Sequence, residues 1–140
     1  LFRAASSAEK IHAANHKAAL AKLGVKSVKA GAFTKPAGTT ADNLKDAIKG
    51  ETYEKDTMYP GMIKDAVAEK QPDATRSMTF ALAAEKQHAA LYTAALKSLK
   101  QKPTPAAFYV CPVCGATFTK AAPTACPVCG TPGTKFQRPA

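Results

Sequence analysis

The sequence has no long apolar run. Nowhere in its 140 residues do about 18 consecutive apolar residues occur, the length that a membrane-spanning helix requires. The first residues show no leader made of positive charge, an apolar core and a small-residue cleavage site, and the chain has no glycine-rich fingerprint for a dinucleotide. These absences predict a cytoplasmic protein that has no membrane segment and binds no nicotinamide cofactor directly.

Acidic residues are scarce. The chain has 10 Asp and Glu against 20 Lys and Arg, a net charge of +10, and such a balance is compatible with phosphates, acidic proteins or nucleic acid as partners. The lysines, however, recur along every helical stretch and form no block, as on an ordinary solvated surface. We therefore expect no nucleic-acid partner.

Cysteine is absent from the first 110 residues and then occurs four times, from Cys111 to Cys129. The C-terminal segment thus differs in kind from the Ala-, Lys- and Leu-rich part before it. A segment this short cannot build a useful apolar core and needs a staple such as a metal ion. We expect two domains, residues 1–102 and 106–140, with a boundary near the Pro-rich stretch at Lys102 to Pro105.

The first domain is predicted to be mainly α. Helices are expected at residues 1–23, 40–68 and 72–99. Gly24 suits a helix C-terminus, and residues 24–40, with three glycines and one proline, predict a long connection like the crossovers of ferritin-like bundles. Pro60 lies inside the second helix and should kink it or force a bulge.

The second and third predicted helices carry inward rows at the three- and four-residue steps of a bundle seam. The row of the second helix is Leu44, Ile48, Glu51, Met58 and Met62. The row of the third helix is Met78, Ala81, Glu85, His88, Tyr92, Ala95 and Leu99. A carboxylate or an imidazole on such a buried seam costs several kcal/mol unless it is paired or bound to a metal, so these groups require a partner.

Each predicted helix carries two potential metal ligands three residues apart, on one helical face. The pairs are Glu9 and His12, Glu51 and Glu54, and Glu85 and His88. Glu-x-x-His pairs that face further carboxylates form the two-metal sites of helical bundles, whereas pairing at the surface does not explain two such pairs on inward rows. Carboxylates with imidazoles favour iron, manganese or zinc. The third histidine, His16, is expected near the rim.

The C-terminal segment contains two copies of one turn, Cys111-Pro-Val-Cys114-Gly and Cys126-Pro-Val-Cys129-Gly. The two-residue gaps allow four sulfurs to reach one ion tetrahedrally, and each Gly permits the left-handed backbone that turns N–H groups toward sulfur. Zinc and iron share this spacing, and two disulfides are a further alternative, although the paired spacing is typical of thiolates in a reducing compartment. Electron transfer through iron here would favour iron in the helical site as well.

Four segments together resemble rubrerythrin along almost the whole chain: AEKIH (8–12), GETYEKDTMYP (50–60), AAEKQH (83–88) and the paired CPVCG turns. The resemblance implies a ferritin-like four-helix bundle, with three of its helices on this chain, followed by a small rubredoxin-like domain. It also implies a di-iron centre, a single iron bound by four cysteine thiolates, and reduction of hydrogen peroxide to water in defence against oxidative stress. Zinc stays an alternative metal for either site.

The resemblance also implies individual roles. Glu9 and Glu85 would bridge the two irons. The terminal ligands would be His88 and Glu51 on one iron, and Glu54 and His12 on the other. In the family, that second iron moves between its Glu and its His as the oxidation state changes, so Glu54 and His12 are catalytic candidates. Tyr59, which resembles a family tyrosine that hydrogen-bonds to the metal carboxylates, is the third.

The family pattern further implies a homodimer and an electron-donor protein, either rubredoxin or an NAD(P)H-dependent reductase. It includes another helix with a glutamate ligand, which we expect from a preceding segment or another chain. The residues leave two other functions open. The first is a basic zinc-ribbon module that binds nucleic acid, but such a module has no role for the buried glutamates. The second is ferritin-like iron oxidation and storage, which has no role for the cysteines.

Overall fold

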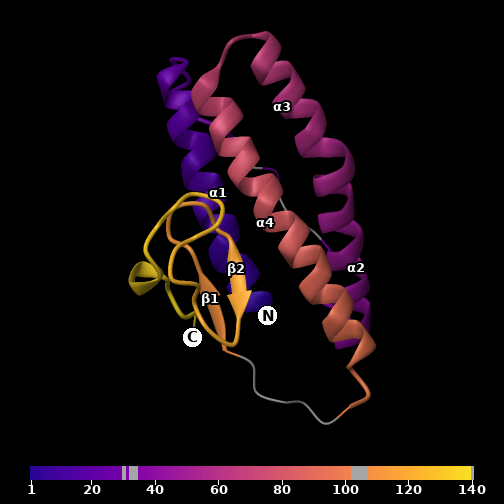
Figure 1. The fold of residues 1–140 in the computed structure, drawn as a ribbon. Coiled ribbons are helices and arrows are strands. Elements are labelled where there is room, and N and C mark those ends of the chain that lie inside the picture. The colour runs from indigo at the N-terminus through magenta and orange to yellow at the C-terminus, as the bar shows by residue number, and fades with distance from the viewer. Residues whose placement is uncertain (30, 32–34, 102–106, 140) are drawn as a thin grey trace.

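The computed structural model describes residues 1–29, 31, 35–101 and 107–139. This part of the chain forms three helical rods, followed by a small domain with two strands (Figure 1). The expected boundary at Lys102 to Pro105 lies outside the described residues. Within the described part, no helix combines the length and apolar character that crossing a membrane would require.

The helical rods confirm the mainly α fold with three helices. The first rod is α1 (Phe2–Lys22), the second consists of α2 (Thr40–Tyr53), the π-helical turn η1 (Glu54–Met58) and α3 (Tyr59–Ala68), and the third is α4 (Pro72–Lys97). The first two rods run in the same direction and α4 runs antiparallel to them (Figure 1). The chain between α1 and α2 therefore returns from one end of the bundle to the other, as a crossover connection does.

Local chemistry explains where these helices start and stop. Gly24 closes α1 with a φ of +83°, a conformation that glycine adopts without steric cost. The side chain of Thr39 accepts a hydrogen bond from the backbone N–H of Asp42 at 3.2 Å and so caps α2. Pro72 begins α4, where its missing N–H costs nothing.

The π-helical turn η1 comes just before Pro60, where a bulge was expected. Its wider turn rotates α3 relative to α2, so the predicted inward row is wrong at Met62, which is 44% exposed. The buried residues of α3 are Tyr59 and Ala66 instead. The row of the third helix is wrong only at its end, because Leu99 lies beyond α4 and is 42% exposed.

The cysteine domain is built on a short antiparallel hairpin. Its elements are β1 (Phe108–Val110), β2 (Thr117–Thr119) and the 3₁₀ turn η2 (Gly133–Lys135), with Val110 opposite Thr117 in the register. This domain packs against α1 and α4 of its own chain (Figure 1). Val110 is fully buried against Ala4 and Ala8 of α1, and Phe80 of α4 packs on the cysteine cluster.

Candidate metal centres

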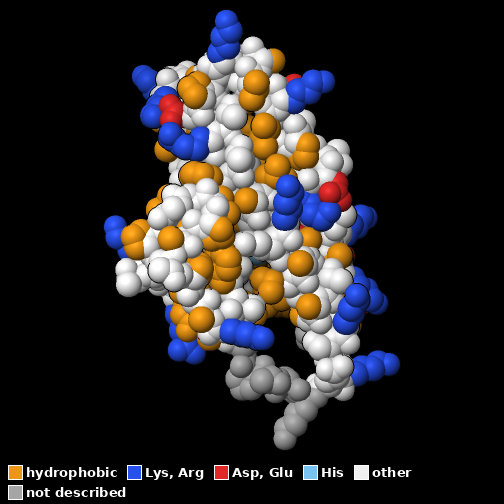
Figure 2. Space-filling view, in the orientation of Figure 1, with side chains coloured by type: hydrophobic (Ala, Val, Ile, Leu, Met, Phe, Trp, Pro, Cys, Tyr) orange, Lys and Arg blue, Asp and Glu red, His pale blue; other side chains and the backbone are white. Residues whose placement is uncertain are grey.

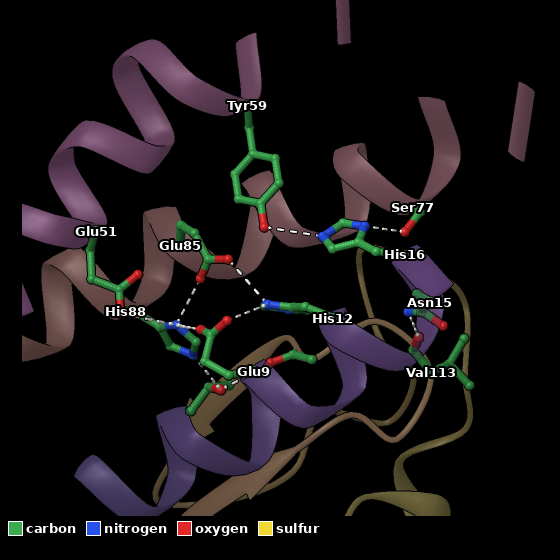
Figure 3. A network of polar contacts seen from close by, with 12 residues as sticks. Glu9, His12, Asn15, His16, Glu51, Tyr59, Ser77, Glu85, His88 and Val113 are labelled. Carbon is green, nitrogen blue, oxygen red and sulfur yellow. Dashed lines mark hydrogen bonds and ion pairs between the residues drawn. The ribbon is translucent and has the colours of Figure 1, made fainter. Parts of the chain in front are cut away.

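A cluster of carboxylates and imidazoles lies between the three rods, in the middle of the helical domain (Figure 3). Its members are Glu9 and His12 from α1, Glu51 from α2, and Glu85 and His88 from α4. Glu85 and His88 are fully buried and His12 is 2% exposed, whereas the side chain of Glu9 is 48% exposed. The i, i+3 spacing on α1 and α4 therefore does place both members of each pair at one centre.

Two carboxylates in the cluster each contact both histidines. Glu85 Oε1 lies 3.1 Å from His12 Nδ1, and Glu85 Oε2 lies 2.9 Å from His88 Nδ1. Glu9 repeats the arrangement, with Oε2 3.3 Å from His12 Nδ1 and Oε1 3.8 Å from His88 Nδ1. The third carboxylate, Glu51, approaches only His88, at 3.5 Å. The cluster thus has two ends, one at each histidine, and two carboxylates that span them.

The charges of the cluster are strongly coupled. Burial alone would lower the pKa of His12, but close contacts with Glu85 and Glu9 outweigh burial and raise it to about 10. Burial likewise opposes the rise in the pKa of His88 to about 9, which its contacts with Glu51 and Glu85 cause. Burial alone would raise the pKa of Glu85, but its contacts with both histidines outweigh burial and lower the pKa to about 2. Protonated imidazoles thus supply positive charge between the carboxylates, where metal cations would supply it after displacing those protons.

The cluster fits a metal pair in its donor chemistry. Ligand atoms of Glu9, Glu51, Glu85 and His88 all lie within 4.8 Å of one another. Two buried carboxylate oxygens, Glu51 Oε2 and Glu85 Oε1, have no well-directed hydrogen bond within the described residues. A buried oxygen without such a bond costs free energy, which metal coordination would recover.

Glu54 and Tyr59 lie beside this tight group. Glu54 is the first residue of η1, and burial together with the nearby Glu85 raises its pKa to about 7. Tyr59 begins α3, is 6% exposed, and points toward Glu85 and the other carboxylates (Figure 3). Burial raises the pKa of Tyr59 above its usual value, and the surrounding carboxylates raise it further. Both residues are thus close enough to be influenced by the cluster, but Glu54 is not among the four residues whose ligand atoms converge.

A second centre is formed by the four cysteines. Their sulfurs all lie within 4.8 Å of one another, and the pairs Cys111 with Cys129 and Cys114 with Cys126 are each 3.5 Å apart. A disulfide bond would bring its two sulfurs to about 2.05 Å, and all four residues are free cysteines. The disulfide alternative is therefore wrong, and the arrangement is that of a four-thiolate metal site.

The two centres are connected through the first cysteine turn. A Cβ atom on Gly115 would lie 2.9 Å from Cδ2 of His12 and still closer to Nε2, so only glycine allows this approach. Thr117 Oγ1 donates a hydrogen bond to Gly115 O and lies 3.0 Å from His88 Nε2. Because its only proton is used, the hydroxyl must accept from His88 Nε2–H, which leaves His88 Nδ1 facing the carboxylates.

Sequence reasoning missed these connecting residues. Thr117 also donates its backbone N–H to Gln87 Oε1 at 2.7 Å, and Asn15 donates to the carbonyl of Val113 at 2.9 Å. Nothing in the repeated CPVCG turns distinguishes the copy that docks on the helices from the copy that does not. The only available signal was the position of Asn15 and Gln87 beside the metal motifs of α1 and α4.

The comparisons with known proteins agree with both centres. A family model described as Rubrerythrin matches residues 1–96. The chain belongs to the rubrerythrin family. A second model, described as the rubredoxin-like domain of rubrerythrin, matches residues 109–137 and so covers all four cysteines. The resemblance drawn from the sequence motifs is confirmed, and the chain carries both kinds of rubrerythrin site, the Glu/His cluster and the four-cysteine cluster.

Two relatives show how far the similarity reaches. Rubrerythrin-2 of Clostridium acetobutylicum is 41% identical over 122 residues, which cover 84% of this chain and 65% of the relative. Nigerythrin of Nitratidesulfovibrio vulgaris is 34% identical over 115 residues, which cover 82% of this chain and 56% of the relative. The chain thus spans less than two thirds of the length of either relative.

Solved structures of nigerythrin have the same fold. The fully reduced, all-ferrous state superposes with a TM-score of 0.89 and 31% identity, covering 96% of this chain and 66% of that chain. The partially reduced state gives a TM-score of 0.90, also with 31% identity, covering 98% and 67%. Nigerythrin is thus known in an all-ferrous and in a partially reduced state.

Proposed function

We propose that this chain is a non-haem iron peroxidase of the rubrerythrin type. It reduces hydrogen peroxide to water at the Glu/His centre and receives electrons through the four-cysteine iron. The observation that carries the proposal is the direct contact between the two centres, where Gly115 meets His12 and Thr117 meets His88. Such contact shortens the path for electron transfer between the two centres, whereas iron storage gives it no purpose.

The contacts support one assignment of the ligands. Glu9 and Glu85 each reach both histidines, so they are the residues that would bridge two irons. His88 and Glu51 lie together and would be terminal ligands at one end. At the other end His12 is already in place, and Glu54, one helical turn beyond Glu51, is the alternative ligand of the same position.

The side chains contribute what a peroxide reaction needs from a protein. Iron held by these residues would supply the electrons that reduce the O–O bond, and two adjacent cations would stabilise the charge that develops on the two oxygens. Burial of Glu85 and His88 keeps bulk water away and strengthens the electrostatic interactions. Thr117 holds His88 in the tautomer that presents Nδ1, and Tyr59 places a protonated hydroxyl beside the carboxylates.

Partners follow from the same proposal. The chain lacks a dinucleotide fingerprint, so electrons from NAD(P)H would arrive through a separate reductase or a rubredoxin. A homodimer, a cytoplasmic location, and a further helix whose carboxylate covers the exposed side of Glu9 stay predictions. The nucleic-acid alternative is not favoured, because Lys and Arg side chains are scattered over the face seen in Figure 2 and the buried glutamates would have no role.

The test uses the intact protein, loaded with iron and reduced without oxygen. Added hydrogen peroxide should be consumed, and the red colour of the ferric four-thiolate site should return as electrons leave it. Glu85→Gln should slow both events on the order of a hundredfold, by analogy with lost metal-site interactions. The control is Glu69→Gln, because Glu69 is exposed at the end of α3. A wild-type protein that consumes no peroxide, or equal rates in the two variants, would contradict the proposal.

A further inference from the structure

His16 is bonded at both ring nitrogens, although no metal motif uses it. It lies on α1, one turn beyond His12. Its Nδ1 is 2.6 Å from Ser77 Oγ on α4, and its Nε2 is 3.2 Å from the Tyr59 hydroxyl on α3. Figure 3 shows the three side chains in a row that ends at the carboxylate cluster. Three helices therefore contribute one polar group each to a single continuous chain of hydrogen bonds.

The hydrogen bonds of Ser77, His16 and Tyr59 can all form with their protons oriented in either direction. Burial, followed by the charge of His12, lowers the pKa of His16, so at neutral pH its ring is neutral, with one donor and one acceptor nitrogen. In one state Tyr59 donates to Nε2 and Nδ1–H donates to Ser77. In the other state Ser77 donates to Nδ1, Nε2–H donates to Tyr59, and the tyrosine proton is free to point at the metal centre.

The two ends of the chain lie in different environments. The inner end is the Tyr59 hydroxyl, which points toward Glu85 (Figure 3). The outer end is Ser77, which lines a cavity of about 320 Å³ together with Asn15 and Val113. Lys22 and Asp73 also line it and form an exposed ion pair at 2.8 Å, so this cavity reaches the surface. Water in the cavity can exchange protons with solvent, whereas the inner end is buried.

We propose that Ser77, His16 and Tyr59 form a proton relay from this cavity to the metal centre. The relay rests on the proposed function, in which hydrogen peroxide takes up two electrons from the reduced iron pair and two protons and forms two water molecules. For each proton that Tyr59 gives to a peroxide oxygen, His16 returns one to Tyr59. His16 is in turn reprotonated at Nδ1 through Ser77 from water. The number of protons on the relay is then unchanged, but His16 now carries its proton on Nδ1, so the ring tautomer and the two hydroxyls must return to their starting orientation before the next transfer.

The first test compares variants of the intact, iron-loaded protein. His16→Phe keeps an aromatic ring beside Tyr59 but removes both nitrogens, and peroxide turnover should fall on the order of a hundredfold. Ser77→Ala should have a smaller effect in the same direction. Thr79→Val is the matched control, because Thr79 lies on α4 like Ser77, and among the described residues its hydroxyl bonds only the backbone of that helix, to Thr75 O at 2.7 Å.

Iron content, isotope effect and chemical rescue distinguish a proton relay through His16 from a purely structural role of this residue. If His16 relays protons, the His16→Phe variant should keep its iron content and red colour, and its turnover should show a larger solvent deuterium isotope effect. The Thr79→Val variant should behave like wild type. Added imidazole should restore turnover to His16→Ala. Loss of iron in proportion to lost turnover, or an unchanged isotope effect with no rescue, would overturn the relay.

Two measurements need no peroxide. Nitrogen-15 NMR of the metal-free protein should show a neutral His16 ring whose Nε2 signal shifts in Tyr59→Phe and whose Nδ1 signal shifts in Ser77→Ala; unshifted signals would overturn the geometry. A pH dye should report that proton uptake during reduction of the iron-loaded protein is slower in His16→Phe. Equal uptake rates contradict the relay. Slower uptake in a protein that consumes no peroxide would contradict only the proposed function.

Discussion

The two CPVCG turns have the same five residues and the same local backbone but different surroundings. Gly115 donates its N–H to Cys111 O at 3.0 Å, and Gly130 donates to Cys126 O at 2.9 Å. Their φ angles are +77° and +76°. Gly115, however, is buried against His12, while the space around Gly130 is open. The repeat therefore determines how sulfur is presented, and the contacts around each copy determine what else the turn can do.

The second cysteine of each turn reflects this difference. Burial raises the pKa of Cys114 in the first turn. Burial also acts on Cys129 in the second turn, but hydrogen bonds from Thr131 outweigh it and lower the pKa of the thiol to about 7. The first turn thus faces the helices, and the second turn, with its half-buried Cys129, faces solvent.

The largest expected effect would show that both turns are equal as ligands. Cys111→Ser or Cys129→Ser should abolish the four-thiolate iron and unfold residues 107–139, because metal binding supplies about 10 kcal/mol or more to small metal domains of this kind. Iron analysis, visible absorbance and far-UV circular dichroism would check this, and the helical signal should persist. A stable red site in either variant would show that the turns contribute unequally.

Alanine substitutions of the two glycines should show most clearly how the two turns differ in role. Alanine at either position meets a backbone strain of about 1–2 kcal/mol from the left-handed conformation. Only Gly115→Ala also pushes the cysteine domain away from His12. Electron transfer to the Glu/His centre should therefore be several-fold slower than in Gly130→Ala, because the tunnelling rate falls with distance. Stopped-flow absorbance would measure that rate. Similar rates in Gly115→Ala and Gly130→Ala would refute the docking role of the first turn.

Substitutions of the threonines that follow the two turns should affect different metal centres. Thr117→Val removes the acceptor for His88 Nε2–H and should weaken metal binding at the Glu/His centre about 10- to 100-fold. Thr131→Val instead removes the hydroxyl 3.0 Å from Cys129 Sγ, which should lower the reduction potential of the four-thiolate iron. Metal titration and redox titration of both variants would distinguish these outcomes. The comparison fails if both variants change the same centre.

The smallest effect is expected at the edge of the docked surface. Asn15→Ala removes a hydrogen bond to the Val113 carbonyl that is accessible to solvent, so the free energy of unfolding should fall by about 0.5–1 kcal/mol. Chemical denaturation followed by circular dichroism would measure the change. A loss of several kcal/mol would mean that docking of the first turn depends on this bond far more than its exposure indicates.

Two of the metal motifs were predictable from sequence because each lies within a single helix. The i, i+3 spacing alone indicated that Glu9 and His12 share a face, and likewise Glu85 and His88. The contact of Gly115 with His12 joins residues far apart in the sequence, and identical turns cannot reveal which copy makes it. Met62 was misplaced for a related reason, since its burial depends on the hydrogen-bonding pattern of η1 rather than on its own hydrophobicity.

The π-helical turn η1 has a consequence for how such a centre can arise. A wide turn accommodates one residue more than an α-helix does, and one residue corresponds to about 100° of rotation around the axis. The wide turn takes up this extra residue locally, so deleting a single codon within residues 55–58 would restore an ordinary α-helical turn and leave both Glu51 and the Tyr59 phenol facing the carboxylates. An insertion can thus add a functional group to a helical bundle without altering any existing side chain.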